Sequence, residues 1–372
     1  MQEYLQPIPL QTILGDATYK KGQYGNEIDC YATQFPQWEN ASIILVGVNE
    51  ERGKGITQQQ DDTTAIRKQL YNLYCWHTEL KICDIGNIIN GKKLTDTYAA
   101  LQQVLSELQA ANKTVIILGN SHDITTPQYQ SFVINQQQIE ATCIDACMDL
   151  SMESIFANDN FLLPMLTGEP NYIRHYNHVG FQSYFVHPTM MDTLNTLRFD
   201  CYRVGKVREH LAEYEPIFRN SNMVSIDVNA LQHSVMPCNT LTPNGFAGDE
   251  ACTLAKYAGM STTLQSIGIY NYKNANDVHQ LGATQIAQMI WYFIDGRNTL
   301  LYENAITQLQ YYKEYTTAFS DISITFYQNI KTKRWWMQLP NHTYTACSYN
   351  DYLLASNNEI PERWLRTQER NL

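Results

Sequence analysis

The sequence lacks the features that mark several large classes of protein. No stretch reaches the roughly eighteen consecutive apolar residues of a transmembrane helix. The first twenty residues contain no basic segment followed by an apolar one, so no signal peptide is expected. The nine cysteines include no Cys-x-x-Cys pair, which argues against structural zinc and against a disulfide framework. We therefore expect free thiols and a cytoplasmic location.

Positive charge is also scarce. The chain has 26 Lys and Arg residues against 37 Asp and Glu residues, which gives a formal net charge of −11. Proteins that bind nucleic-acid phosphates need a basic surface, so a nucleic-acid partner is excluded. Binding to an anionic membrane surface is disfavoured for the same reason. A Gly-x-Ser-x-Gly motif is absent as well, which argues against a serine hydrolase built on that turn.

Short apolar runs alternate with longer segments of helical character. The expected strands lie at 41–48, 80–86, 113–119, 139–146, 182–188, 200–205, 222–228 and 263–270. The expected helices lie at 62–74, 96–111, 190–197, 249–258 and 283–293. Several of the apolar runs are continuous, as in strands covered on both faces. The pattern predicts an α/β fold, a three-layer α/β/α sandwich with a mostly parallel, eight-stranded sheet.

The character of the chain changes near its C-terminal end. We expect residues 1–318 to form the α/β core with an N-terminal extension, and residues 319–372 to form an aromatic-rich appendage. Its aromatic residues include Trp335, Trp336, Tyr349, Tyr352 and Trp364. Such a cluster can be a surface for a protein partner or a lid packed on its own domain, and packing on the core is the expectation.

Polar clusters follow three of the expected strands, in the stretches "GNSHD" (119–123), "DACMD" (145–149) and "SIDVNALQH" (225–233). Parallel strands deliver their C-terminal ends to one edge of a sheet, where ligand sites lie. His122, Asp145, Asp149 and Asp227 would meet there, and their carboxylates would repel one another without a cation. A metal site is therefore favoured over turns in which the aspartates cap backbone N–H groups.

These three motifs, in this order and at this spacing, resemble those of the ureohydrolase superfamily of arginases, agmatinases and formimidoylglutamases. The resemblance covers roughly residues 40 to 300 and favours the formimidoylglutamase-like branch. It implies an arginase-like fold and a metal-dependent hydrolase, usually with two manganese ions, that cleaves C–N bonds of guanidino or formimino groups in a small-molecule substrate. Members are often homo-oligomers.

The same resemblance implies which residues would hold the ions. The first metal position maps to His122, Asp145, Asp149 and Asp227, and all four are present. The second position shares two of these aspartates and adds a histidine and an aspartate, which are replaced here by Cys147 and Asn229. An amide oxygen is a weaker manganese ligand than a carboxylate, and a thiolate suits zinc or iron better. One manganese ion is expected rather than two, and zinc or iron stays open.

Asn271 matches the position where the family commonly has a glutamate that pairs with a cationic substrate. An amide cannot neutralise a guanidinium, which disfavours an arginine-like substrate. Two functions follow. In the first, Asp145 and Asp227 hold a metal-bound water that hydrolyses a linear amidine. In the second, a non-catalytic relative keeps the fold and binds a protein partner. His175, His178 and His233 are expected to have structural roles.

Overall fold

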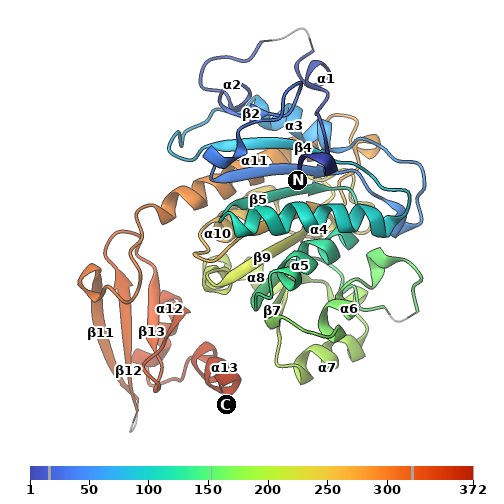
Figure 1. Cartoon of the computed structure of the whole chain (residues 1–372). Helices are drawn as coiled ribbons and strands as arrows, with labels where there is room; N and C mark the ends of the chain where they lie inside the picture. The colour runs from blue at the N-terminus through green and yellow to red at the C-terminus, as the bar shows by residue number, and fades with distance from the viewer. Residues whose placement is uncertain (16–17, 152, 320–321, 372) are drawn as a thin grey trace.

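The central feature of the protein is a wide, mostly parallel β-sheet (Figure 1). The computed structural model describes residues 1–15, 18–151, 153–319 and 322–371. Within these residues the sheet has ten strands in the order β1-β4-β3-β5-β10-β9-β6-β7-β8, with β2 paired to β4. Its eight longer strands are β3 (Ile43–Val48), β4 (Ile82–Ile88), β5 (Thr114–Gly119), β6 (Ile139–Ile144), β7 (Ile173–Phe181), β8 (Asp200–Arg203), β9 (Ser221–Asp227) and β10 (Ser266–Tyr270). These eight run parallel, which confirms the predicted fold class.

Two short strands extend the sheet beyond the eight that were predicted. They are β1 (Leu5–Gln6), which is antiparallel to β4, and β2 (Asp29–Cys30), which is parallel to it. Each has two residues, too few to produce a recognisable sequence pattern. Both come from the N-terminal extension, which is thereby joined to the core sheet.

The predicted strand at 182–188 is wrong. The strand in this part of the chain is β7, and a 3₁₀ turn, η6 (Ser183–Phe185), follows it. The central residues of β7 are polar, so a search for apolar runs missed it. Their side chains find partners inside the fold: His175 lies 3.1 Å from an Asp200 oxygen, and the Tyr176 hydroxyl lies 2.9 Å from Nδ1 of His178. Pairing of this kind lets a polar strand be buried.

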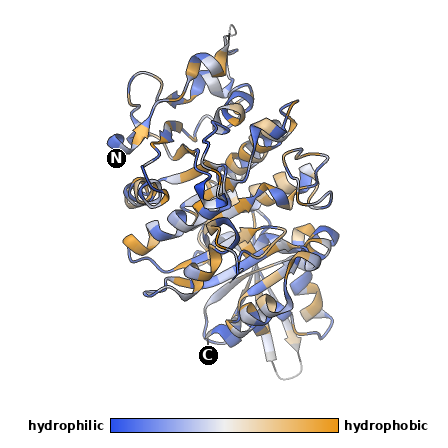
Figure 2. Cartoon of the chain, turned by 90° about the vertical axis from the view of Figure 1, so that its right-hand side faces the viewer, coloured by the Kyte–Doolittle hydropathy of each residue, from blue (hydrophilic) through white to orange (hydrophobic). Residues whose placement is uncertain are grey.

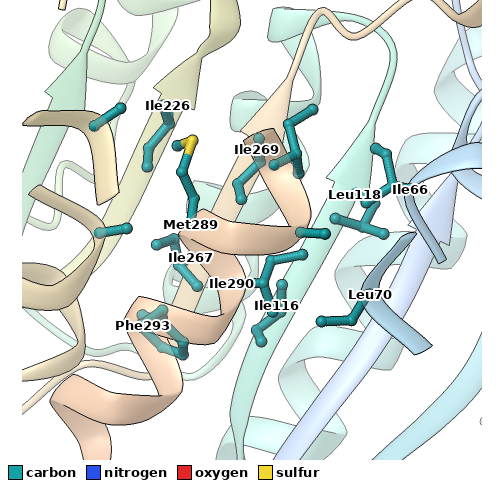
Figure 3. Packing of buried hydrophobic residues seen from close by; sticks show 14 of the residues in the cluster. Ile66, Leu70, Ile116, Leu118, Ile226, Ile267, Ile269, Met289, Ile290 and Phe293 are labelled. Carbon is teal, nitrogen blue, oxygen red and sulfur yellow. The ribbon is translucent and has the colours of Figure 1, made fainter. Parts of the chain in front are cut away.

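Helices cover both faces of the sheet and complete three layers (Figure 1). One face packs against α3 (Thr63–Tyr71), α10 (Gly248–Gly259) and α11 (Leu281–Leu300), and the other against α4 (Leu94–Ala110) and α5 (Thr125–Ile134). Figure 3 shows α11 contributing Met289, Ile290 and Phe293 to the first of these contacts. These helices carry hydrophobic and hydrophilic residues along their length, as one-sided burial requires (Figure 2). The shorter helices are α1 (Leu10–Leu14), α2 (Tyr24–Glu27), α6 (Leu162–Thr167), α7 (Pro188–Thr196), α8 (Val204–Glu209) and α9 (Glu215–Phe218).

A second, antiparallel sheet lies at the C-terminal end of the chain (Figure 1). Its strands are β11 (Tyr312–Phe319), β12 (Ile322–Asn329), β13 (Trp335–Gln338) and β14 (Tyr344–Cys347), and helices α12 (Tyr349–Ser356) and α13 (Glu362–Asn371) follow. The predicted boundary after residue 318 lies inside β11. The sheet has a hydrophobic cluster of its own, in which Trp335 stacks on Tyr352 at 5.1 Å and Trp364 is buried.

Buried ion pairs join this sheet to the core. Arg334, which precedes β13, lies 2.9 Å from a carboxylate oxygen of Glu215 and 2.7 Å from one of Glu303. Glu215 also pairs with Arg219, whose Nη1 donates to the carbonyl oxygen of Trp335. Among the helices of the described residues, none is both long and apolar enough to cross a membrane.

Candidate metal centre

Four neighbouring strands bring the predicted site residues to one edge of the sheet. The strands are β5, β10, β9 and β6, in that order. His122 opens a 3₁₀ turn, η4 (His122–Ile124), just after β5, and Asp145 follows β6 directly. Asp227 is the last residue of β9, and Asn271 follows β10. Because the strands are parallel, all four residues come from the same ends.

The imidazole of His122 is the centre of the cluster. Its Nδ1 atom lies 3.1 Å from Oδ2 of Asp149, 3.3 Å from Oδ2 of Asp145 and 3.5 Å from Oδ2 of Asp227. The His122 side chain is fully buried, and the three carboxylates are almost so. The four residues that were predicted for the first metal position are therefore brought together around one point.

Ser225 holds the other side of the His122 ring, and the sequence analysis did not identify it. His122 Nε2 lies 2.9 Å from Oγ of Ser225, which lies 2.7 Å from Oγ1 of Thr125. This contact directs Nδ1 towards the carboxylates. Ser225 and Asp227 are two residues apart on β9 and so share a face, which is the signal that could have indicated it.

Cys143 is a second residue that the sequence analysis missed. Its Sγ atom lies 3.9 Å from Nε2 of His122. One possible ligand atom from each of His122, Cys143 and Asp145 lies within 4.8 Å of the others. Burial raises the pKa of the Cys143 thiol to about 11, so it is a neutral neighbour at ordinary pH.

The electrostatics of the cluster reflect crowding of negative charge in a buried place. Burial, and then the charge of Asp145, raise the pKa of Asp227 to about 6. Burial also raises the pKa of Asp145, with Asp149 adding to the effect. Although burial opposes protonation of His122, its contacts with Asp145 and Asp149 raise the pKa of the imidazole well above the ordinary value. The neighbouring carboxylates stabilise the protonated, positively charged imidazole.

The residues of the altered second position have other partners. The backbone N–H of Cys147 donates to Oδ1 of Asp145 at 3.1 Å, and that of Asn229 donates to Oδ1 of Asp227 at 2.7 Å. The Cys147 thiol is half-buried, and burial and the nearby aspartates raise its pKa far above the ordinary value. Asn271 is buried, and its Nδ2 donates to Oδ2 of Asp227 at 2.6 Å. Both oxygens of Asp227 thus accept a hydrogen bond, Oδ1 from Asn229 and Oδ2 from Asn271.

Lys54 is a further residue that the sequence analysis did not identify. It lies in the 3₁₀ turn η3 (Arg52–Lys54) after β3, the strand that pairs with β5. Its Nζ donates to the backbone carbonyl oxygen of Asn120 at 2.6 Å, two residues before His122. The sequence shows only a loop lysine, and the pairing of β3 with β5 is what brings it here.

The three other histidines named from the sequence lie in contacts away from His122. His175 lies beside Asp200 and His178 beside Tyr176, both on the polar strand β7. Burial lowers the pKa of His178 to about 4. Nδ1 of His233 lies 2.7 Å from the carbonyl oxygen of Asn239 in its own loop.

Comparisons with known proteins agree with the fold. The model of the arginase family matches residues 41–295. Formiminoglutamase from Trypanosoma cruzi, in a crystal structure with Mn2+2, is similar with a TM-score of 0.64 at 17% identity, over 72% of this chain and 96% of that one. Formimidoylglutamase from Bacillus subtilis has a TM-score of 0.65 at 15% identity, over 77% and 96%. Agmatine ureohydrolase of Thermoplasma volcanium has a TM-score of 0.60 at 16% identity, over 77% and 97%.

Proposed function

The chain belongs to the arginase family, and we propose that it is a hydrolase that holds one divalent metal ion and cleaves a C–N bond of a linear amidine. Water would add to the amidine carbon, and the C–N bond to the rest of the substrate would break. A formimino substrate would yield an amine and formamide, and a guanidino substrate would yield an amine and urea. The formimino class is the better candidate here, because Asn271 stands where a carboxylate would pair with a guanidinium.

One observation supports this proposal above the others. Nδ1 of His122 has an oxygen of each of Asp145, Asp149 and Asp227 within 3.5 Å. One nitrogen and three carboxylate oxygens suit a hard divalent cation such as manganese. Oδ2 of Asp145 is buried and, apart from Nδ1 of His122 at 3.3 Å, has no hydrogen-bond partner among the described residues, so it is available to bind an ion. The residues therefore fit one ion.

They fit a second ion poorly. Cys147 and Asn229 supply no carboxylate, and the other oxygen of Asp227, Oδ1, already accepts from the backbone N–H of Asn229. A divalent ion in the first position would lower the pKa of water and stabilise negative charge that develops on the substrate. The protein's own part would be to hold that ion through His122 and the three aspartates. Ser225 would keep the imidazole in place, and the buried surroundings would strengthen each of these electrostatic interactions.

A second candidate function rests on the same contact between Asn271 and Asp227. If that amide blocks the site, the protein would keep the fold without activity and bind a partner instead. A cytoplasmic location and manganese as the ion also belong to the proposal.

An activity assay of purified protein saturated with manganese distinguishes between these functions. We expect release of formamide from N-formimino amino acids, and little or no urea from arginine or agmatine. The variant Asp149→Asn is the matched control, because it removes one ligand charge with little change in shape. Ordinary arginase turnover would contradict the assignment of Asn271. Manganese binding without turnover of any amidine would favour the partner-binding protein.

A further inference from the structure

A loop that follows Asp149 folds back onto the turn that carries His122. Residues 153–161, termed the return loop here, contain the 3₁₀ turn η5 (Ala157–Asp159) and lead into α6. The backbone N–H of Leu162, the first residue of α6, donates to the carbonyl oxygen of Asp149 at 3.1 Å. The loop thus leaves Asp149 and closes on the same residue, and between these two points it reaches His122.

Asn158 makes the contact with His122. Its Oδ1 atom accepts the backbone N–H of His122 at 2.9 Å. His122 is the first residue of η4, which continues into α5, and N–H groups in the first turn of a helix have no acceptor within the helix. Ser121 precedes this turn without capping it; its hydroxyl lies 3.3 Å from the same Asn158 oxygen and donates to Asp123. A residue 36 positions further along the chain therefore supplies the acceptor.

The return loop also contacts the ring of His122. The Phe161 side chain is buried, and its ring lies 4.6 Å from the imidazole, centroid to centroid, at an angle of 65°. Ser154 holds the shape of the loop, because its hydroxyl donates to Asp159 at 2.7 Å and its carbonyl oxygen accepts from Nδ2 of Asn160 at 3.0 Å. The loop therefore presents a defined surface to His122.

The sheet alone does not join the two residues that the return loop contacts. His122 follows β5 and Asp149 lies in the segment after β6, and strands β10 and β9 separate β5 from β6. The return loop spans this gap and bonds to the backbone of both residues. Nδ1 of His122 lies closer to Oδ2 of Asp149, at 3.1 Å, than to Asp145 or Asp227. The loop is therefore a direct link between two of the four proposed ligands.

We infer that Asn158 is a positioning residue for the metal ion, because it holds His122 where Nδ1 can share an ion with the three aspartates. This inference rests on the proposed metal site and adds to it a residue from a separate loop. A ligand must be held to within about 0.5 Å to bind an ion well, and a buried N–H that loses its acceptor would shift to find another. Asn158 acts on the ion only through His122. By linkage, an ion that fixes His122 also stabilises its contact with Asn158.

Manganese titration of the full-length protein by calorimetry, after removal of metal, tests this role. Asn158→Leu keeps the size of the side chain and removes the acceptor, so it should bind manganese about tenfold more weakly than wild type. Asn158→Ala, a smaller change that the fold tolerates more easily, should weaken binding in the same direction. Asn158→Asp keeps an acceptor and should bind at least as tightly as wild type.

Amide hydrogen exchange, followed by mass spectrometry on fragments that contain residue 122, gives a second readout. Manganese should slow the exchange of the His122 N–H in wild type, because the ion and the Asn158 contact stabilise each other. The slowing should be smaller in Asn158→Leu at saturating manganese. Equal slowing in both proteins would show that the contact and the ion are independent, which contradicts the inference.

Asn160 supplies the matched controls, because it lies in the same loop and its side chain donates to Ser154 instead of contacting His122. Asn160→Leu should leave manganese affinity unchanged, and Asn160→Asp measures the effect of an added charge alone. Unchanged binding in Asn158→Leu, or equal weakening in Asn160→Leu, would overturn the inference and leave the metal site in place. If wild type binds no manganese, the proposed function fails, and this inference falls with it.

Discussion

Nδ2 of Asn271 donates a 2.6 Å hydrogen bond to the same Asp227 oxygen that lies 3.5 Å from Nδ1 of His122. Asp227 Oδ2 is therefore shared between the candidate metal ligands and the residue that follows β10. This contact links the predicted substrate position to the metal position, and its removal should affect metal binding before it affects any substrate.

The first prediction concerns Asn271→Asp. The replacement has the same shape and tolerates the positive φ of 70° at this position, but it faces Asp227 with a second carboxylate. The apo protein should lose about 1–3 kcal/mol of stability, because a hydrogen bond becomes a repulsive contact. Manganese should raise the melting temperature more in this variant than in wild type. Equal manganese effects in both proteins would show that Asp227 does not contact the ion.

The second prediction concerns Cys147→His combined with Asn229→Asp. These changes restore a nitrogen ligand and a carboxylate at the second position, while the shared ligands Asp145 and Asp227 are already in place. Wild type should hold about one manganese ion per chain and the double variant about two, by elemental analysis after dialysis. Two ions in wild type would contradict the proposed single-ion site.

The third prediction concerns Ser225→Ala. Loss of the hydroxyl that holds Nε2 of His122 should weaken manganese binding about tenfold to a hundredfold, as removal of such supporting contacts typically does. Ser221→Ala is the control, because Ser221 begins the same strand and forms a similar buried hydroxyl pair, 2.7 Å from Thr142, away from the site. If both variants weaken binding equally, the effect comes from strand β9 as a whole.

The fourth prediction concerns Glu215→Gln. Glu215 is almost buried, and its one negative charge is shared between two buried arginines, Arg219 and Arg334. Breaking a buried pair of this kind should cost about 3–5 kcal/mol in the free energy of unfolding, measured by urea denaturation. Glu362→Gln removes an exposed partner of Arg366 and should have little effect. A small loss in Glu215→Gln would show that Glu303, which pairs with Arg334, and the backbone carbonyl oxygens that accept from Arg219 suffice without the charge of Glu215.

The fifth prediction concerns pH. Although burial opposes it, contacts with His175, Arg370 and Arg366 lower the pKa of Asp200 to about 2. A carboxylate whose folded pKa is below its unfolded value of about 4 stabilises the fold above pH 4 and loses this contribution as pH falls towards 2. Wild type should therefore lose more stability than Asp200→Asn between these values. Equal losses in urea midpoints would show that the contacts of Asp200 with His175, Arg366 and Arg370 contribute nothing.

The fold could be predicted from sequence because most strands of the sheet are continuous runs of apolar residues. Seven of the eight predicted ranges overlap the long strands, and β7 was missed because its polar residues are paired only in three dimensions. His122, Asp145, Asp149 and Asp227 were found for the same reason that they meet: each follows or ends a parallel strand. Ser225 could have been found from its spacing, because it lies two residues before Asp227 on the same face of β9. Lys54 could not, because its place depends on which loop lies beside which, and local sequence does not encode that.

The ion pairs between the two sheets have a consequence for biosynthesis. Glu215 and Arg219 are made more than a hundred residues before Arg334 and Trp335. Until Arg334 and Trp335 have been made, Arg219 has Glu215 as its ion-pair partner but lacks the carbonyl oxygen of Trp335. Glu215 in turn lacks Arg334. A chain that stops before residue 334 would leave these buried groups with fewer partners, which lowers the stability of the core.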